Sequence, residues 1–271
     1  MSTQVLELST LKRLLPMRHV DAHKQDFGHV LILGGSIGMS GAARMAAEAA
    51  LRAGAGMVTV ATHPDHAAYI NIGRPEIMAY GIENPTKQLP LLLKKASVLV
   101  IGPGLSDDAW SQQLTHAIAS STLPKVIDAG ALDRINDFDL THTVCTPHPG
   151  EAARILQVTP QKIQQDRLSA IKQLTQHYSA TWVLKGHQTL IETKTQLMQC
   201  PYGNPGMASA GMGDVLSGVI GALLAQHLTP HDAACLGVAV HAYAGDLIAQ
   251  QKGQRGLLAT DLFEEIRTLL N

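Results

Sequence analysis

A glycine-rich segment that runs into an apolar helix is the first place in this sequence where chemistry is expected. Residues 203–225 read GNPGMASAGMGDVLSGVIGALLA, so small residues lead directly into a predicted helix. The backbone amides of Gly211, Met212 and Gly213 would converge at the positive end of the helix dipole and form an anion hole for a phosphoryl group in transfer. Asp214 follows, where its carboxylate could take a proton from an attacking hydroxyl. The alternative is that Asp214 only caps the helix.

A second segment, TPHPGEAARIL at 146–156, places a histidine and an acidic residue where a predicted strand passes into a helix. His148 would contact a substrate at the carboxyl end of the strand. Glu151, three residues later, would help to hold a hydrated Mg²⁺. The structural alternative is that Pro149 opens the helix and Glu151 complements its dipole, and Glu151 can do both.

A third segment, VLKGHQTLI at 183–191, predicts a strand, a turn and a second strand. The turn from Lys185 to Thr189 could grip the ribose or phosphate of a nucleotide, or it could be an ordinary hairpin. Glycines also follow predicted strands in HVLILGGSIGMSGAA and LVIGPGL, where ligands of open α/β sheets collect. GGSIGMSG lacks the GxGxxG order and no GxxxxGK[ST] occurs, which disfavours a Rossmann dehydrogenase and a P-loop NTPase.

These segments are joined by short apolar runs that alternate with helix-like stretches. Several runs are continuous in Val, Ile and Leu, which is typical of strands buried on both faces and predicts a mostly parallel sheet between helices. Strands are predicted at 29–35, 56–62, 97–102, 125–130, 142–147 and 181–186, and helices at 41–53, 214–225, 232–249 and 260–270. Residues 82–90 are predicted to be a polar loop. We expect one α/β domain over residues 1–271.

The helix predicted at 41–53 carries a polar stripe. Arg44, Glu48 and Arg52 recur at every fourth residue among Ala, Met and Leu. The pattern indicates a solvated face with no functional role.

Composition excludes several classes of partner. The 21 Lys and Arg nearly balance the 22 Asp and Glu, and no basic run could neutralise a row of phosphates, which disfavours nucleic acid. No apolar stretch is long enough to span a bilayer and the N-terminus lacks a signal-peptide pattern, so we expect a cytoplasmic protein without membrane contact. Cys145, Cys200 and Cys235 contain no CxxC pair and are expected to be reduced, buried thiols.

Taken together, six segments resemble the ADP-dependent NAD(P)H-hydrate dehydratase family: GGSIGMSGAA, RAGAGMV, VIGPGL, TPHPGE, VLKGHQT and NPGMASAGMGDVLSG. The resemblance covers nearly the whole chain, in the order expected for the family. It implies a ribokinase-like three-layer sandwich, ADP as co-substrate with Mg²⁺, and a homotetramer. In such proteins the dehydratase is often fused to an epimerase, which this chain is too short to include, so we expect the epimerase to be supplied separately.

The family pattern assigns residues position by position. To the hydrated substrate, NADHX or NADPHX, it assigns Ala42, Gly104, His148 and Asp214. To the adenine nucleotide it assigns Lys185, Gly186, His187, Gln188, Thr189 and Gly213.

The implied chemistry follows from the poor leaving ability of hydroxide. Asp214 would deprotonate the ring hydroxyl as it attacks the terminal phosphate of the nucleotide. The amides at 211–213 and Mg²⁺ would absorb the developing charge. The ring nitrogen then expels phosphate and restores the dihydropyridine.

Two positions depart from the family pattern. SAGMGDVLSG has Ala210 for a glycine and Met212 for a small hydroxyl residue. Ala210 is a difficulty only if that position needs a positive φ, and Met212 keeps its backbone amide. VIDAGAL has Gly130 where a second Asp is typical, which leaves Asp128 as the nearest candidate for that role.

Two other functions remain open on the residues alone. One is a true kinase of the same superfamily that phosphorylates a vitamin precursor with the same Asp214. The other is a nucleotide-binding sensor without catalysis, which the changes at Gly130 and Met212 make conceivable.

Overall fold

The computed structural model describes residues 3–271 and builds them around one ten-stranded sheet in the order β1-β10-β9-β8-β7-β6-β5-β2-β3-β4. All strand pairs are parallel except β8 with β9 and β9 with β10. This confirms the mostly parallel α/β sheet. The strands are β1 (Gln4–Val5), β2 (His29–Leu33), β3 (Met57–Thr62), β4 (Ile77–Gly81), β5 (Val98–Ile101), β6 (Lys125–Ile127), β7 (Thr143–Cys145), β8 (Thr181–Leu184), β9 (Leu190–Glu192) and β10 (Leu197–Gln199).

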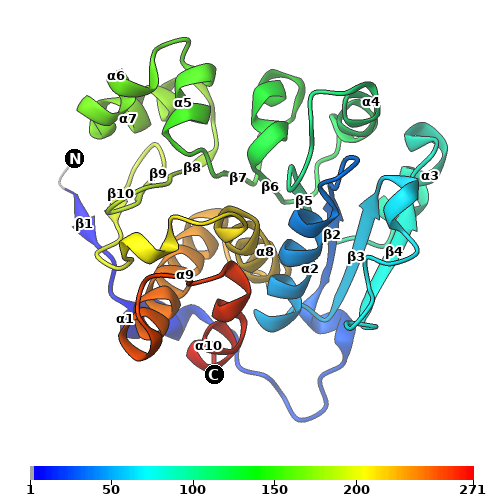
Figure 1. Cartoon of the computed structure of the whole chain (residues 1–271), viewed down its shortest axis with the longest axis horizontal. Helices are drawn as coiled ribbons and strands as arrows, with labels where there is room; N and C mark the ends of the chain where they lie inside the picture. Colours follow the sequence, from blue (N-terminus) through cyan, green and yellow to red (C-terminus); the bar gives the residue numbers. More distant parts are fainter. Residues whose placement is uncertain (1–2) are drawn as a thin grey trace.

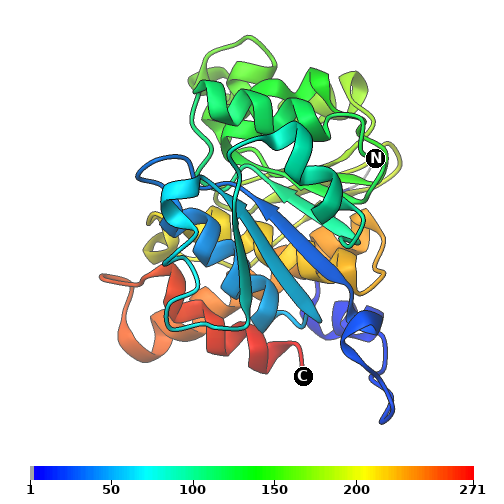
Figure 2. The ribbon, with the colours of Figure 1, turned by 90° about the vertical axis from the view of Figure 1, so that its right-hand side faces the viewer.

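Helices cover both faces of this sheet, which makes a three-layer molecule (Figures 1 and 2). One face carries α1 (Leu8–Leu11), α2 (Ser40–Arg52), α8 (Met212–Ala225), α9 (Pro230–Lys252) and α10 (Leu262–Leu269). The other carries α3 (Pro85–Leu93), α4 (Ala109–Ile118), α5 (Pro149–Ile155), α6 (Pro160–Gln165) and α7 (Arg167–His177). Short 3₁₀ helices occur as η1 (Lys12–Leu14), η2 (Lys24–Phe27), η3 (Pro64–His66), η4 (Ala129–Asp137), η5 (Pro205–Met207) and η6 (Ala259–Asp261).

The strands divide their side chains between two hydrophobic cores. On β2, Val30 and Ile32 face the layer of α2, α8 and α9, whereas Leu31 and Leu33 face the layer of α3–α7. This alternation follows from the two-residue period of a strand. Because both faces are buried, the strand reads as a continuous apolar run, as the sequence predicted.

Helix α8 lies at the centre of the first layer, as expected from its nearly uniform apolar sequence. Gly218 permits a close approach, since a Cβ there would collide with the backbone oxygen of Ala46 on α2. The small residues of both helices thus let their backbones touch. In the described part of the chain no helix is both long and apolar enough to cross a membrane.

Two predictions about local structure are wrong. Residues 82–90 are not a polar loop, because Asn84 caps α3 by accepting from the amide of Lys87 at 3.2 Å, and Pro85 occupies the first helical position. Leu89 and Leu92 then bury one side of that helix. Asn followed by Pro was a helix-start signal that the loop interpretation overlooked.

The polar stripe on α2 is also not a free solvated face. Arg44 donates to the carbonyls of Ile70 at 2.7 Å and Ile72 at 2.8 Å, and Glu48 pairs with Arg74. The stripe therefore fastens the loop between β3 and β4 to α2. Arg52 pairs with a residue of α10 in the same way.

Candidate active site at the start of helix α8

Helix α8 begins with a glycine in the left-handed conformation. Gly211 is its N-cap, with φ of 91°, and an added Cβ would lie 2.6 Å from the sulfur of Met45. Among the described residues with positive φ, Ala210 does not appear. The alanine at this position is therefore compatible with the loop, because the strained conformation falls on its glycine neighbour.

Asp214 stands in the first turn of α8 and is not its cap, since Gly211 takes that position and no side chain caps the helix. Its side chain is partly buried. Burial, followed by the negative charge of Asp128, raises the pKa of Asp214 to about 7, although Lys185 acts in the opposite direction. A carboxyl group with such a pKa can accept and return a proton at neutral pH.

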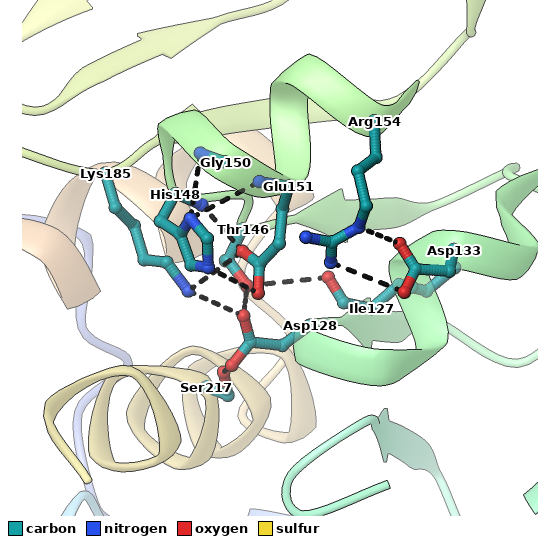
Figure 3. A network of polar contacts seen from close by, with 10 residues as sticks. All are labelled: Ile127, Asp128, Asp133, Thr146, His148, Gly150, Glu151, Arg154, Lys185 and Ser217. Atoms are coloured by element: carbon teal, nitrogen blue, oxygen red, sulfur yellow. Dashed lines mark hydrogen bonds and ion pairs between the residues drawn. The ribbon is translucent and has the colours of Figure 1, made fainter. Parts of the chain in front are cut away.

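The buried carboxylate whose charge acts on Asp214 is Asp128, and Figure 3 shows the polar network around it. Asp128, directly after β6, is 1% exposed. Its Oδ1 accepts from Lys185 Nζ at 2.7 Å and from Thr146 Oγ1 at 2.8 Å, and its Oδ2 accepts from Ser217 Oγ at 2.7 Å. Burial opposes its ionisation, but Lys185 and the two hydroxyls hold the pKa of Asp128 below its usual value.

Lys185 follows β8 and remains charged. Burial lowers its pKa, but the charges of Asp128 and Glu151 outweigh burial and raise it overall. Its Nζ lies 3.8 Å from Glu151 Oε2. An added Cβ on Gly213 would lie 3.2 Å from the same nitrogen, so the ammonium sits directly against the start of α8.

His148 and Glu151 cap helix α5 reciprocally. His148 Nδ1 accepts from the amides of Gly150 at 3.0 Å and Glu151 at 3.3 Å, while Glu151 Oε2 accepts from the amide of His148 at 2.7 Å. Burial lowers the pKa of the imidazole and raises that of Glu151. The structural interpretation of Glu151 as a first-turn charge is thus confirmed, which leaves its role toward Mg²⁺ a separate prediction.

The two small residues assigned to substrate lie side by side. An added Cβ on Gly104 would be 3.1 Å from the Cβ of Ala42, so the loop after β5 meets the start of α2. Nearby, a Cβ on Gly130 would collide with the backbone oxygen of Leu105. The backbone of Leu105 therefore takes the space of the second aspartate typical of the family, and Asp128 is the carboxylate nearest in sequence to that position.

A cavity of about 430 Å³ opens near the start of α8. Lys185, Gly186, His187, Thr189 and Gly213 line it, so five of the six residues predicted to contact the adenine nucleotide share one cavity. Gln188 shares their loop, but its side chain accepts from Gln199 at 3.0 Å. The remaining lining comes from α8, α9 and the preceding loop: Tyr202, Gly203, Asn204, Pro205, Met207, Ala208, Met212, Leu216, Val238, His241 and Ala242.

Most of that apolar lining was not predicted from the sequence, and neither was Arg167. Arg167 opens α7 and donates to the carbonyls of His187 and, at 2.8 Å, of Leu184. It thereby fixes the turn that leads from β8 to β9. Ser217 was also missed, although its position three residues after Asp214 places it on the same face of a helix.

The carboxylates do not form a metal cage. Among residues 3–271 no group of three or more His, Cys, Asp or Glu side chains is placed to hold a metal ion. The oxygens of Asp128 are occupied by protein donors, and an ammonium lies close to Glu151. This donor set fits a hydrated Mg²⁺ carried by nucleotide phosphates, with Glu151 reached through water, and it does not fit direct coordination.

Comparison with proteins of known sequence supports the resemblance. A bifunctional NAD(P)H-hydrate repair enzyme of Coxiella burnetii is 47% identical over 272 residues, which are 99% of this chain and 56% of that protein. The chain thus spans about half the length of such bifunctional relatives. The ADP-dependent (S)-NAD(P)H-hydrate dehydratase of Neisseria meningitidis is 37% identical over 267 residues, 94% of this chain and 88% of that protein.

Solved structures agree with the fold. A ribokinase-like superfamily protein of Enterococcus faecalis matches with a TM-score of 0.87 and 30% identity, over 99% of this chain and 95% of that one. The ADP/ATP-dependent NAD(P)H-hydrate dehydratase of Bacillus subtilis, co-crystallised with ATP and Mg²⁺, matches with a TM-score of 0.87 and 28% identity over 99% and 98% of the two chains.

The fold is therefore ribokinase-like, as the resemblance implied. The family model described as NAD(P)H-hydrate dehydratase matches residues 30–268. With that match over most of its length, this chain belongs to the NAD(P)H-hydrate dehydratase family of enzymes.

Proposed function

We propose that residues 1–271 act as one dehydratase domain that returns the S-epimer of hydrated NADH or NADPH to the intact coenzyme at the expense of ADP. One observation carries this proposal. The cavity assigned to the nucleotide and the charged cluster share Lys185 and Gly213, and Asp214, with a pKa of about 7, is the next residue. Phosphate donor and proton acceptor are thereby brought to the same helix start.

The reaction divides into phosphoryl transfer and elimination. Asp214 takes the proton of the ring hydroxyl. The hydroxyl oxygen attacks the terminal phosphorus of ADP, and AMP leaves. The ring nitrogen lone pair then expels phosphate from the neighbouring carbon, and loss of a proton to solvent from the next ring carbon restores the dihydropyridine. The balance is hydrated coenzyme plus ADP giving coenzyme, AMP and inorganic phosphate.

The residues around Asp214 have distinct tasks in this scheme. The amides at 211–213 lie at the start of α8 and would stabilise charge on the transferring phosphoryl group. Lys185 neutralises a neighbouring phosphate oxygen, and Asp128 holds it there at 2.7 Å. Mg²⁺, bound to the diphosphate and reached by Glu151 through water, would supply further charge neutralisation.

The substrate would lie across the loops at the carboxyl ends of the strands. Ala42 and Gly104 offer backbone contacts where α2 and the loop after β5 meet. His148 stands about half exposed on the other side of the charged cluster, with its side chain 51% accessible. Ala42, Gly104 and His148 follow the carboxyl ends of the parallel strands β2, β5 and β7, where ligands of open α/β sheets bind.

Relatives with two activities suggest the metabolic setting. Because the bifunctional relatives are named as NAD(P)H-hydrate repair enzymes, we propose that an epimerase supplies the S-epimer to this chain. From the family resemblance alone we also propose that the chain works in the cytoplasm as a homotetramer.

The test is a coupled measurement on hydrated NADH. With ADP and Mg²⁺, the absorbance of NADH should return while AMP and inorganic phosphate form in equal amounts. Accumulation of a phosphorylated alcohol from a vitamin precursor, with no return of NADH, would instead identify a small-molecule kinase. Nucleotide binding without turnover of either kind would identify a sensor.

A further inference from the structure

We infer that Asp246 is a positioning residue that sets nucleotide affinity by holding one wall of the 430 Å³ cavity in place. This inference rests on the proposed function, because it takes the cavity as the nucleotide site. The wall is the loop of residues 203–208, which precedes α8 and lies along α9 (Figure 1).

Both oxygens of Asp246 bind this wall. The Oδ2 atom accepts from the amide of Gly203 at 2.9 Å, and the Oδ1 atom accepts from Asn204 Nδ2 at 2.8 Å. The second bond orients the amide of Asn204 so that its Oδ1 accepts from the backbone of Gly206 at 3.0 Å. One carboxylate on α9 therefore fixes the loop at Gly203, Asn204 and Gly206, through two direct bonds and one relayed bond.

Side-chain packing holds the same loop against α9. Gly245, the neighbour of Asp246 on α9, is covered by the side chain of Met207, since a Cβ there would collide with it. Met207 in turn lines the cavity, as do Gly203 and Asn204. The part of the wall that faces the ligand is thus the part that Asp246 and its neighbour hold.

The wall contains little regular structure of its own, only the three-residue turn η5 at Pro205–Met207. Without Asp246 the loop of residues 203–208 would become ordered only when the ligand binds. The conformational entropy lost on ordering it would weaken binding. Hydrogen bonds to a charged acceptor are also stronger than neutral ones. Asp246 acts through this loop and not on the reacting atoms, so its loss should change affinity and spare the chemical step.

Asp246→Asn tests the inference. Both partners are donors, so the new amide can accept from only one of them and presents its own NH₂ to the other. We expect the Kd for ADP with Mg²⁺, measured by calorimetry, to rise about tenfold, while kcat at saturating ADP stays within about twofold. The matched control is Asp232→Asn on the same helix, whose carboxylate accepts from Thr229 Oγ1 at 2.7 Å near the start of α9.

An exchange of the two side chains separates positioning from general stability. Asn204→Asp alone places two carboxylates face to face and should also weaken ADP binding by about tenfold. In the double variant Asn204→Asp with Asp246→Asn, the amide at 246 can donate to 204 and accept from Gly203, and the carboxylate at 204 still accepts from Gly206. The Kd for ADP should return to within about threefold of the parent.

Three results would overturn the inference. The first is ADP binding by Asp246→Asn that equals the parent. The second is an exchanged variant that recovers its unfolding temperature but not its ADP affinity, and the third is a loss of kcat with unchanged Kd. If Asp246→Asn does not fold, Asn204→Ala removes the same side-chain bond and must show the weaker binding. Failure of the unaltered protein to bind ADP would instead contradict the proposed function itself.

Discussion

Two sides of the same helix start differ in the interactions that they offer. Toward Asp128, α8 meets a buried network of charges in which oxygens and nitrogens lie 2.7 to 2.8 Å apart. Toward α9 it meets a cavity walled by side chains such as Leu216, Val238 and Ala242. The charged side can move a proton and neutralise phosphate, whereas the apolar wall of the cavity suits an uncharged part of a ligand. Rate and affinity should therefore respond to different residues.

The largest change in rate is expected when Asp214 on the charged side is replaced. Asp214→Asn keeps the shape of the side chain but removes the base, so kcat should fall by about 10²- to 10⁴-fold. The Kd for ADP should stay close to that of the parent, because the nucleotide cavity is lined by other residues. Initial rates of NADH return and calorimetric ADP titration measure the two quantities. Unchanged turnover would contradict the assigned role.

Removal of the carboxylate at Asp128 should affect folding as well as rate. Asp128→Asn leaves the partly buried ammonium of Lys185 without its partner, which should lower the free energy of unfolding by about 3 kcal/mol. Denaturant unfolding measures the change. The double variant with Lys185→Met removes both charges and should recover part of that loss. An unfolding free energy that does not respond to Asp128→Asn would show that the network is structurally unimportant.

A pH series tests whether the charged side controls the base. Only deprotonated Asp214 can accept a proton, and its pKa is about 7, so kcat should rise about tenfold between pH 6 and pH 8. The charge of Asp128 helps to raise that pKa, so in Asp128→Asn the midpoint should move to lower pH. A rate that falls over this range, or a midpoint that moves upward, would contradict the arrangement.

An effect smaller than that of Asp214→Asn is expected on the apolar side. Ala208 is exposed and lines the cavity, so Ala208→Phe should fill its mouth without disturbing a core. We expect the KM for ADP to rise about tenfold, with kcat at saturation and unfolding temperature retained. Steady-state rates at varied ADP measure this. A fall in kcat with unchanged KM would show that the two sides are not separable.

Much of the fold could be predicted from local patterns. The apolar runs at residues 29–35 and 97–102 contain β2 and β5, and the helix expected at 232–249 is the core of α9. Burial on both faces leaves a continuous apolar run in any parallel strand, so the signal survives without knowledge of neighbours. By contrast β4, β1 and β10 were not predicted. The edge strand β4 (IMAYG) is apolar but leaves Met78 and Tyr80 exposed, and β1 and β10 have only two and three residues, so their pairing with other strands defines them.

The local structure that carries the predicted site residues was readable for a similar reason. The glycines before Asp214 and the turn at 185–189 are contiguous in sequence, and a helix start or a hairpin needs no distant partner to be recognised. The prediction that the three cysteines are buried and not joined in disulfides is also confirmed. Widely spaced cysteines without a CxxC pair do not form a disulfide framework.

Only the tertiary structure decided which charges act on Asp214 and which residues form the wall of the cavity proposed for the nucleotide. Asp128 and Lys185 are 57 residues apart and meet at 2.7 Å because parallel strands deliver their carboxyl ends to one edge of the sheet. Asp246 reaches the loop before α8 from a helix that follows it, and Arg44 reaches the carbonyl of Ile70 across 26 residues. Sequence spacing carries no information about such contacts, since their geometry is set by the packing of whole layers.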